Sequence, residues 1–490
     1  MKKIAACLIL AAGLSGVFAQ TNNPAVRSLS LTDCFTEALQ HNLDVQVQRY
    51  EPQISLYDLH AAYAGYYDPT LSFSGSHGHN RSGGFFFTNA VPVTEDNSFH
   101  AGIAGALPSG LIYDFFGSAA NTYGSAPENS GGQVGVSLTQ PLLKNFWIDG
   151  GRLAISVAKD QLKISEQGLR QQIITTVTAV ETAYYELIYA RENVKVKQEA
   201  LTLAETQLHD DNQRVQIKVV AERGGTLEQD EAQVAQSRAS LIAAQNSFAV
   251  AQNALKNLLT DNYAQWHDVT IEPTETLEAA QQPFDLQDSW SKGMTLRPDL
   301  VQTRLNVEQQ GLQLKYDRNQ LFPQLNLVGS VGYNGAGYRL HDAFDQYGNA
   351  TRPFYSYGAQ FSIPLGNARA RNNLKAGQAS EKELLLRLKQ LEQNVMVEID
   401  NAVKSAQSAW ESVDATQKAR VFAEAALDAE QKKYAVGKST TFTVLQLQNN
   451  LTSARSQEIR ALANYHEALA SLAQQEGSTL QRDKLDLEVK

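Results

Sequence analysis

Residues 355–363 read Tyr355-Ser356-Tyr357-Gly358-Ala359-Gln360-Phe361-Ser362-Ile363, and they decide the fold class. Apolar side chains occupy the odd positions and small polar residues the even ones, as in a β-strand with one apolar and one polar face. Similar alternation occurs at 70–80, 132–140 and 324–334. A strand crosses an outer membrane in about nine to eleven residues, so we predict a sheet between lipid and water. The alternative is a soluble antiparallel sheet packed on a core.

A long insertion, rich in Gly, Ser and Asn, lies between the first two of these strands, from about residue 80 to 131. Within it, Phe99–Leu107 and Leu111–Phe116 flank Pro108-Ser109-Gly110, which predicts a further hairpin over 98–117. The pattern leaves open whether this hairpin adds two membrane strands or forms an extracellular flap.

The remaining sequence predicts long helices. Apolar residues recur at intervals of seven in one stretch, and mostly small residues follow three positions later, as in a coiled-coil seam. The first series is Leu227, Val234, Leu241, Phe248 and Leu255, and the second is Ser237, Ala244, Ala251 and Leu258. Residues 151–213, 368–433 and 442–476 are similar and lack proline. Taken alone, these helices would favour an elongated coiled-coil rod.

The chain repeats one order of elements. A helical pattern from Leu31 leads to a strand after Pro69, and another from Leu286 leads to a strand after Pro323. We therefore predict two tandem helix–strand–strand–helix repeats. The predicted segments are a signal peptide at 1–19, a first repeat at 20–280 with its helical turn at 214–228, a second repeat at 281–477 with its turn at 434–441, and a polar tail at 478–490.

The N-terminal sequence, the cysteine number and the net charge indicate where the protein goes and what it binds. Lys2-Lys3, an apolar run and Val17-Phe18-Ala19 predict a secretory signal, after which Cys34 is the only cysteine, so no internal disulfide is expected. No later run of eighteen apolar residues predicts a membrane helix, and the net charge of -10 argues against nucleic acid as a partner.

Four or six strands cannot close a barrel without exposing the unpaired backbone groups of the edge strands to lipid, so several copies must pool their strands.

Four motifs resemble those of the TolC-like outer-membrane efflux protein family in order and spacing. They are Gln140-Pro141-Leu142-Leu143, Arg297-Pro298-Asp299-Leu300, Phe322-Pro323-Gln324-Leu325 and Ile363-Pro364-Leu365-Gly366. The resemblance covers nearly the whole mature chain. It implies a mainly α fold with a membrane β-barrel part: a homotrimer with a twelve-stranded barrel in the outer membrane of a Gram-negative-type envelope and an α-helical barrel in the periplasm.

The resemblance also implies partners. A periplasmic adaptor (membrane fusion) protein and an inner-membrane transporter would complete a tripartite efflux pump or a type I secretion system, in which the channel is passive. Tyr434-Ala435-Val436-Gly437 matches the family's turn motif, whereas the first repeat has Lys218 where glycine is usual. The candidate adaptor-docking residues are Lys218, Val219, Tyr434, Val436, Gly437 and Lys438.

A candidate gate lies beside these turns. Thr226 and Gln229 have capping-box spacing, so a returning helix should begin there with Glu228, Asp230 and Glu231 in its first turns. Three copies of Glu228 or Asp230 would ring the entrance and favour cations; the alternative is an ordinary acidic helix start. Family members often carry acidic gate residues in the second repeat, but the matching positions here are Thr443 and Gln446.

Enzyme signals are absent from the sequence. It contains no nucleophile elbow, phosphate loop or dinucleotide fingerprint, so no catalytic residue or cofactor is predicted. His77-Gly78-His79 lies in an expected loop without a third ligand, so no metal site is predicted either. Two rival functions remain: a structural trimeric coiled coil or adhesin, and a substrate-specific porin, which would need mostly strand.

Overall fold

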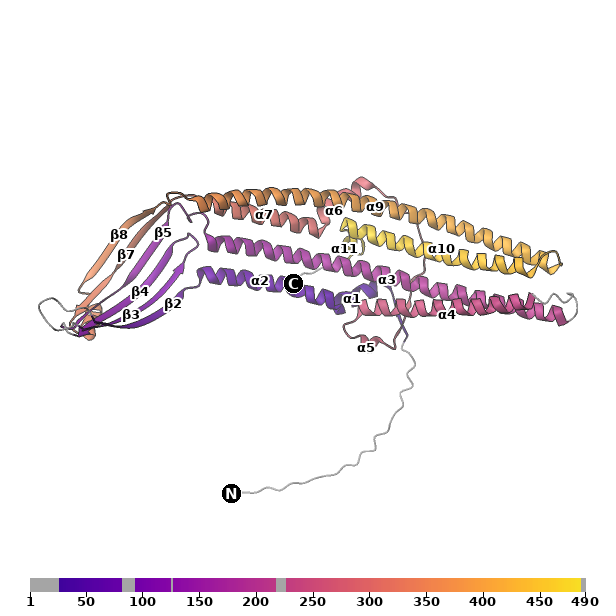
Figure 1. Cartoon of the computed structure of the whole chain (residues 1–490), viewed down its shortest axis with the longest axis horizontal. Coiled ribbons are helices and arrows are strands. Elements are labelled where there is room, and N and C mark those ends of the chain that lie inside the picture. The colour runs from indigo at the N-terminus through magenta and orange to yellow at the C-terminus, as the bar shows by residue number, and fades with distance from the viewer. Residues whose placement is uncertain (1–25, 82–92, 125–126, 217–225, 486–490) are drawn as a thin grey trace, which may run out of the picture. The chain divides into compact units, whose positions relative to one another are not determined.

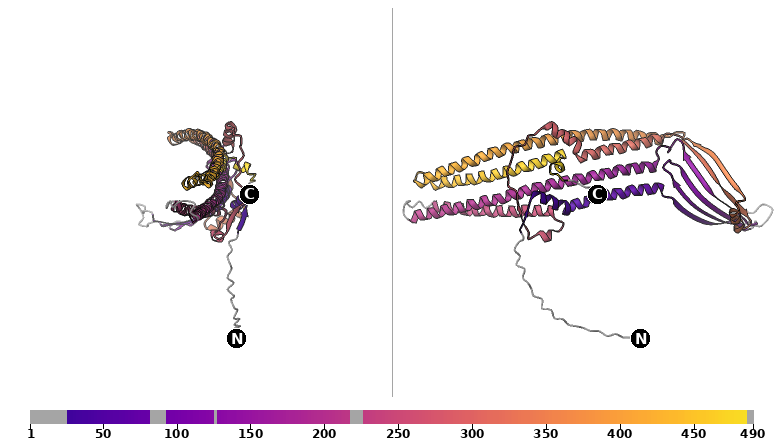
Figure 2. Two further views of the ribbon diagram at one scale, coloured as in Figure 1. Left: turned by 90° about the vertical axis from the view of Figure 1, so that its right-hand side faces the viewer. Right: turned by 180° about the vertical axis from the view of Figure 1, so that it is seen from behind.

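The computed structural model describes residues 26–81, 93–124, 127–216 and 226–485, which belong to two compact units (Figures 1 and 2). The helical unit comprises Met1–Asn42, Ala179–Ala280 and Glu411–Glu467, and the strand unit comprises Leu43–Thr178, Gln281–Trp410 and Ala468–Lys490. The expected signal peptide, Lys218 and Val219 lie outside the described residues.

Helices account for most of the described chain, close to where the sequence predicts them. The helices are α1 (Leu31–His41), α2 (Leu43–Tyr67), α3 (Gly150–Gln216), α4 (Thr226–Leu259), α5 (Tyr263–Trp266), α6 (Leu286–Leu296), α7 (Pro298–Asn319), α8 (Leu340–Gly348), α9 (Ala368–Ala435), α10 (Thr441–Glu476) and α11 (Thr479–Arg482). None of these helices is long and apolar enough to cross a membrane.

Each unit has its own apolar packing. In the helical unit, Leu427 of α9 packs with Val444 and Leu451 of α10. In the strand unit, Leu300 of α7 packs with Ile399 of α9. Burial of such seams, rather than helix propensity, stabilises helices of this length.

The strand unit contains one antiparallel sheet of six strands. They are β2 (Thr70–Arg81), β3 (Val93–Ala106), β4 (Ile112–Gly124), β5 (Asn129–Pro141), β7 (Gln324–Gly337) and β8 (Pro353–Ser362), and they pair in that order. One end of the sheet joins α2, α3, α7 and α9, as Figure 1 shows. We call this the helical end and the opposite end the distal end.

The two faces of the sheet differ chemically along its whole width. Strand pairing places one residue from each strand in a row, and one row contains only apolar residues: Leu71, Ile103, Phe115, Val136, Val331 and Tyr355. We call the face that bears this row the apolar face. The opposite face carries a row of small or polar residues: Thr70, Ala104, Asp114, Ser137, Ser330 and Ser356. The prediction of strands with one apolar and one polar face is confirmed.

The structure of the inserted segment, from about residue 80 to 131, decides between the flap and the membrane strands and differs from two expectations. Its hairpin is β3 and β4, which lie inside the sheet between β2 and β5 rather than in a flap. Within the described residues, this sheet therefore has six strands, not the four per chain that a twelve-stranded trimer requires. The reason is that both inserted strands continue the same alternation. His77 and His79 lie on β2, beside Glu95 of β3, and not in a loop.

The short helix α8 connects β7 to β8 and covers the distal part of the apolar face. Its Ala343 and Tyr347 lie so close to Gly335 and Gly132 that neither glycine has room for a side chain. The Tyr347 hydroxyl donates a hydrogen bond to the Ser118 carbonyl oxygen at 3.2 Å. Glycine at these positions is therefore what lets α8 pack against β5 and β7.

Two details were not anticipated from the sequence. β1 (Val26–Leu29) and β6 (Thr270–Pro273) form a parallel two-stranded sheet in the helical unit. The predicted polar tail at 478–490 begins with α11, whose Thr479 and Leu480 are buried.

Candidate functional site

The turn between α9 and α10 has the predicted glycine-dependent geometry. Gly437 has a φ of 72°, in the left-handed region that favours glycine. The Lys438 amide donates to the Lys433 carbonyl oxygen at 2.9 Å, which caps the end of α9. Val436 is 68% exposed, and Gly437 and Lys438 are exposed as well. The turn therefore offers a projecting surface for a partner.

Tyr434 is different from its neighbours because it points inward. Its hydroxyl donates to Asp211 Oδ1 at 2.7 Å, and the Thr441 hydroxyl donates to Asp211 Oδ2 at 3.1 Å. Asp211 lies near the end of α3 and is only 4% exposed. Charge-assisted hydrogen bonds of this kind are about twice as strong as neutral ones. Asp211 therefore ties the α3–α4 hairpin to the α9–α10 hairpin.

A second carboxyl group lies beside this tie. Asp230 of α4 is 1% exposed. Burial, together with the neighbouring Asp211 carboxylate, raises the pKa of Asp230 to about 7. When protonated, Asp230 donates a hydrogen bond to Asp211. Asp230 thus takes up a proton near neutral pH at the place where the two hairpins meet.

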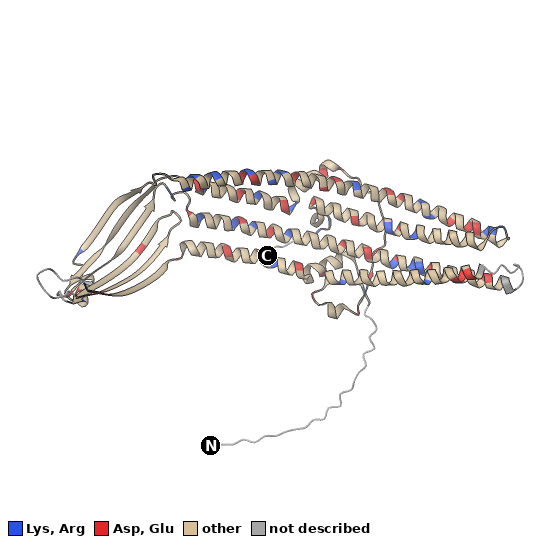
Figure 3. Cartoon of the chain, viewed as in Figure 1, with Lys and Arg blue, Asp and Glu red and all other residues tan. Residues whose placement is uncertain are grey.

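The other candidate gate residues occupy different environments. Of the three acidic candidates, Glu228 and Glu231 are exposed, whereas Asp230 is buried. Gln446 is exposed, and the half-buried Thr443 lies 3.0 Å from Thr440, hydroxyl to hydroxyl. Acidic residues gather on α3 and α4 near their shared turn (Figure 3).

Further polar contacts join the α3–α4 hairpin to α10 along their length. Gln233 of α4 and Asn449 of α10 exchange two amide hydrogen bonds, at 2.8 and 3.0 Å. Arg455 of α10 bonds Glu199 of α3 at 2.9 Å, and Arg460 pairs with Glu186. Exposed ion pairs contribute little individually, about 0–1 kcal/mol each. The buried Asp211 contacts are therefore the strongest polar link between the hairpins.

We expect the Asp230 pKa to make the hairpin contact depend on pH. The proton on Asp230 stabilises the closed contact fully below its ordinary pKa of 3.8, and this contribution is lost as pH rises through about 7. Between these values, opening should become up to about tenfold easier per pH unit. Hydrogen exchange of the backbone amides around Asp211, corrected for intrinsic rate, measures this opening.

Substitution of Asp230 by asparagine should remove most of that pH dependence, because the amide is always neutral. The matched control is Glu231→Gln, an exposed neighbour, which should keep the wild-type profile. Equal pH profiles in the wild type and Asp230→Asn would contradict the assignment.

Comparison with known proteins agrees with this architecture. A profile of the family described as "Outer membrane efflux protein" matches residues 35–260 and 294–478. The chain belongs to the outer membrane efflux protein family. The resemblance predicted from the sequence motifs is thus confirmed, as is the prediction of a channel protein rather than an enzyme.

Individual relatives are distant. The chain is 25% identical over 363 residues to the pyoverdine export outer membrane protein OpmQ of Pseudomonas aeruginosa, covering 70% of this chain and 69% of that protein. It is 22% identical over 296 residues to the outer membrane protein TolC of Escherichia coli, covering 59% of each.

Solved structures share the fold at lower identity. The CmeC outer membrane channel of Campylobacter jejuni superposes with a TM-score of 0.68 at 15% identity, covering 94% of this chain and 90% of that one. VceC of Vibrio cholerae superposes with a TM-score of 0.67 at 17% identity, covering 91% and 96%. The channel fold of this family is therefore shown, and the porin alternative is wrong because most of the described chain is helical.

Proposed function

We propose that three copies of this outer membrane efflux protein form one passive conduit from the periplasm to the exterior. The strands would cross the outer membrane and the helices would extend into the periplasm. A periplasmic adaptor would dock at the hairpin turns, and an inner-membrane transporter would supply the energy, in a tripartite efflux pump or a type I secretion system.

The observation that carries this proposal is the sheet itself. One face bears an apolar row across all six strands of this sheet, and the only charged residues on these six described strands, not counting histidine, are Arg81, Glu95, Asp96 and Asp114. Among the described strands, β2 and β8 each pair on one side only, so both outer edges carry unpaired backbone groups. Exposing such groups to lipid costs several kcal/mol each, so the edges must pair with other copies.

Conductance in a planar bilayer tests the conduit directly. The purified protein should give discrete, cation-selective current steps. Glu228→Gln combined with Glu231→Gln should reduce cation selectivity, since these exposed carboxylates would be removed from the entrance. Gln446→Ala, an exposed neutral position, is the matched control. Unchanged selectivity in the double variant would remove the acidic ring from the proposal.

The adaptor proposal has its own test. A photo-reactive amino acid at Val436 should cross-link to a periplasmic protein in cells, because this side chain projects from the α9–α10 turn. The same residue at Tyr434, which points inward to Asp211, should cross-link within the chain instead. If the photo-reactive residue at Val436 formed no cross-link to a second protein, docking at this turn would be contradicted.

The second candidate is a structural trimeric coiled-coil envelope protein without transport activity. It accounts for the long helices but gives no role to a six-stranded sheet with an apolar face. A folded trimer that never conducts in the bilayer would favour this candidate.

A further inference from the structure

The inserted hairpin β3–β4 is integrated into the wall. The apolar residues Ile103 and Phe115 of the hairpin continue a row that begins on β2 and ends on β8. Ile103 and Phe115 lie in the row between Leu71 and Val136. On the other face, Ala104 and Asp114 lie between Thr70 and Ser137. The hairpin therefore separates the same lipid and water sides as the strands around it.

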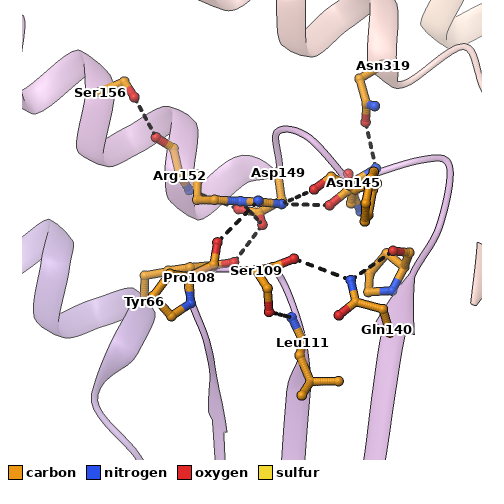
Figure 4. Close-up of polar contacts among 12 residues, drawn as sticks. Tyr66, Pro108, Ser109, Leu111, Gln140, Asn145, Asp149, Arg152, Ser156 and Asn319 are labelled. Carbon is orange, nitrogen blue, oxygen red and sulfur yellow. Dashed lines mark hydrogen bonds and ion pairs between the residues drawn. The ribbon is translucent and has the colours of Figure 1, made fainter. Parts of the chain in front are cut away.

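The turn of this hairpin is also held at the helical end of the sheet (Figure 4). Arg152 of α3 donates to the Pro108 carbonyl oxygen at 3.5 Å, and the Gln140 side chain donates to the Ser109 carbonyl oxygen at 3.3 Å. Arg152 is fixed by Asp149 at 2.8 Å, and Asp149 also accepts from the Tyr66 hydroxyl at 2.6 Å.

Backbone geometry adds to this anchoring. Gly110 has a φ of 80°, and a side chain there would meet Arg152 at 2.9 Å. The turn is thus shaped to receive the arginine, whose guanidinium also donates to the Asn145 and Phe146 carbonyl oxygens. A flap that swings free of the wall would need none of these contacts.

Register shows that the hairpin is a modular addition. Leu71 and Val136 occupy the same row, as do Ser72 and Gly135. Without β3 and β4, strands β2 and β5 would be antiparallel neighbours with their faces already matched. The insertion therefore widens the sheet by two strands without changing the inside–outside order.

We propose that each chain contributes six strands to the channel, so that three copies close an eighteen-stranded barrel. This inference rests on the proposed function. Barrel diameter grows roughly linearly with strand number, so the mouth would be about one and a half times as wide as a twelve-stranded one, and about twice the area. Barrels of sixteen to eighteen strands enclose an aqueous channel.

The chain keeps this lumen open. Helix α8 covers Gly132 and Gly335, which lie on the apolar face, so it packs outside the barrel rather than within it. The polar face has mostly small residues, including Ser74, Ser118 and Ser137. The wide mouth therefore fits cargo of larger cross-section than a twelve-stranded barrel admits.

Single-particle imaging of the full-length protein in lipid nanodiscs counts the strands. We expect eighteen for the full chain and twelve for a variant lacking residues 93–124. Polymers of increasing size can be added on the outer side of the membrane. The smallest polymer radius that no longer enters the mouth should be about one-third smaller in the deletion variant.

Thiol accessibility in the full chain gives a test that does not depend on the folding of the deletion variant. Ala104→Cys on the polar face should react with a charged, membrane-impermeant thiol reagent, whereas Ile103→Cys on the apolar face should be shielded by lipid and react only with an uncharged, lipid-soluble one. The native Cys34 is fully buried, so the background is low.

The outcomes separate this inference from the proposed function. Twelve strands in the full-length wall, or equal reactivity of both cysteines, would overturn the wide barrel and leave the conduit in place. A protein with no closed barrel at all would overturn both.

Discussion

Replacing Asp211 with alanine should open the channel at rest at the end where the helical hairpins turn. Tyr434 and Thr441 would lose their shared acceptor, and each hydrogen bond to a charged group is worth about 1.5–3 kcal/mol. Even one such loss shifts the balance between closed and open states by about tenfold. Single-channel recordings should therefore show a higher open fraction, and cells should become more sensitive to large toxic molecules.

The matched control is Asp210→Ala, because Asp210 is the adjacent carboxylate and is exposed. It should leave both the open fraction and the drug sensitivity at wild-type levels. If the Asp211 variant stayed as closed as this control, the hairpin tie would not be the gate.

Placing arginine at Leu138 should prevent insertion into the outer membrane. Leu138 is 43% exposed and pairs with Gly329, midway along the apolar stretch of β7. A lipid-facing arginine at the bilayer midplane costs about 2–4 kcal/mol, and it would occur in every copy. The amount of folded trimer recovered from outer membranes should fall steeply.

Ser137→Arg is the matched control, since it is the next residue on the same strand and faces the other side. It lies directly opposite Asp114 on β4, so a partner carboxylate is available. This variant should assemble normally. Failure of both variants, or of neither, would contradict the assignment of the apolar face to lipid.

The fold could largely be predicted from local periodicity. Helices α3, α4, α9 and α10 and strands β2, β5, β7 and β8 follow from heptad and alternating patterns that one chain satisfies by itself. The number of strands in the wall could not, because the pattern of the hairpin β3–β4 is compatible both with two membrane strands and with an extracellular flap. Its place depends on pairing with β2 and β5, and on a turn anchored by Arg152, which is distant in sequence.

The burial of the two carboxyl groups could be predicted in part. Residues Leu227, Val234 and Leu241 set a heptad phase that places Asp230 in the seam, three positions after Leu227. This heptad phase indicates that Asp230 is buried, whereas its position in the first turns of α4 suggests an exposed ring of carboxylates. Asp211 was missed, although it follows Leu201, Ala204 and Leu208 at seam spacing. Burying a carboxylate in an apolar seam costs free energy unless the carboxylate is paired. The seam position of Asp211 could therefore have indicated that it bonds to a partner.

We infer that one chain is an incomplete part of a conduit whose sheet closes only with other copies. Native mass spectrometry of the protein extracted from outer membranes in mild detergent should give a mass of three chains. Cysteines placed along both edges of the sheet should form a disulfide between β2 of one copy and β8 of its neighbour. A folded, stable monomer with both edges free would contradict it.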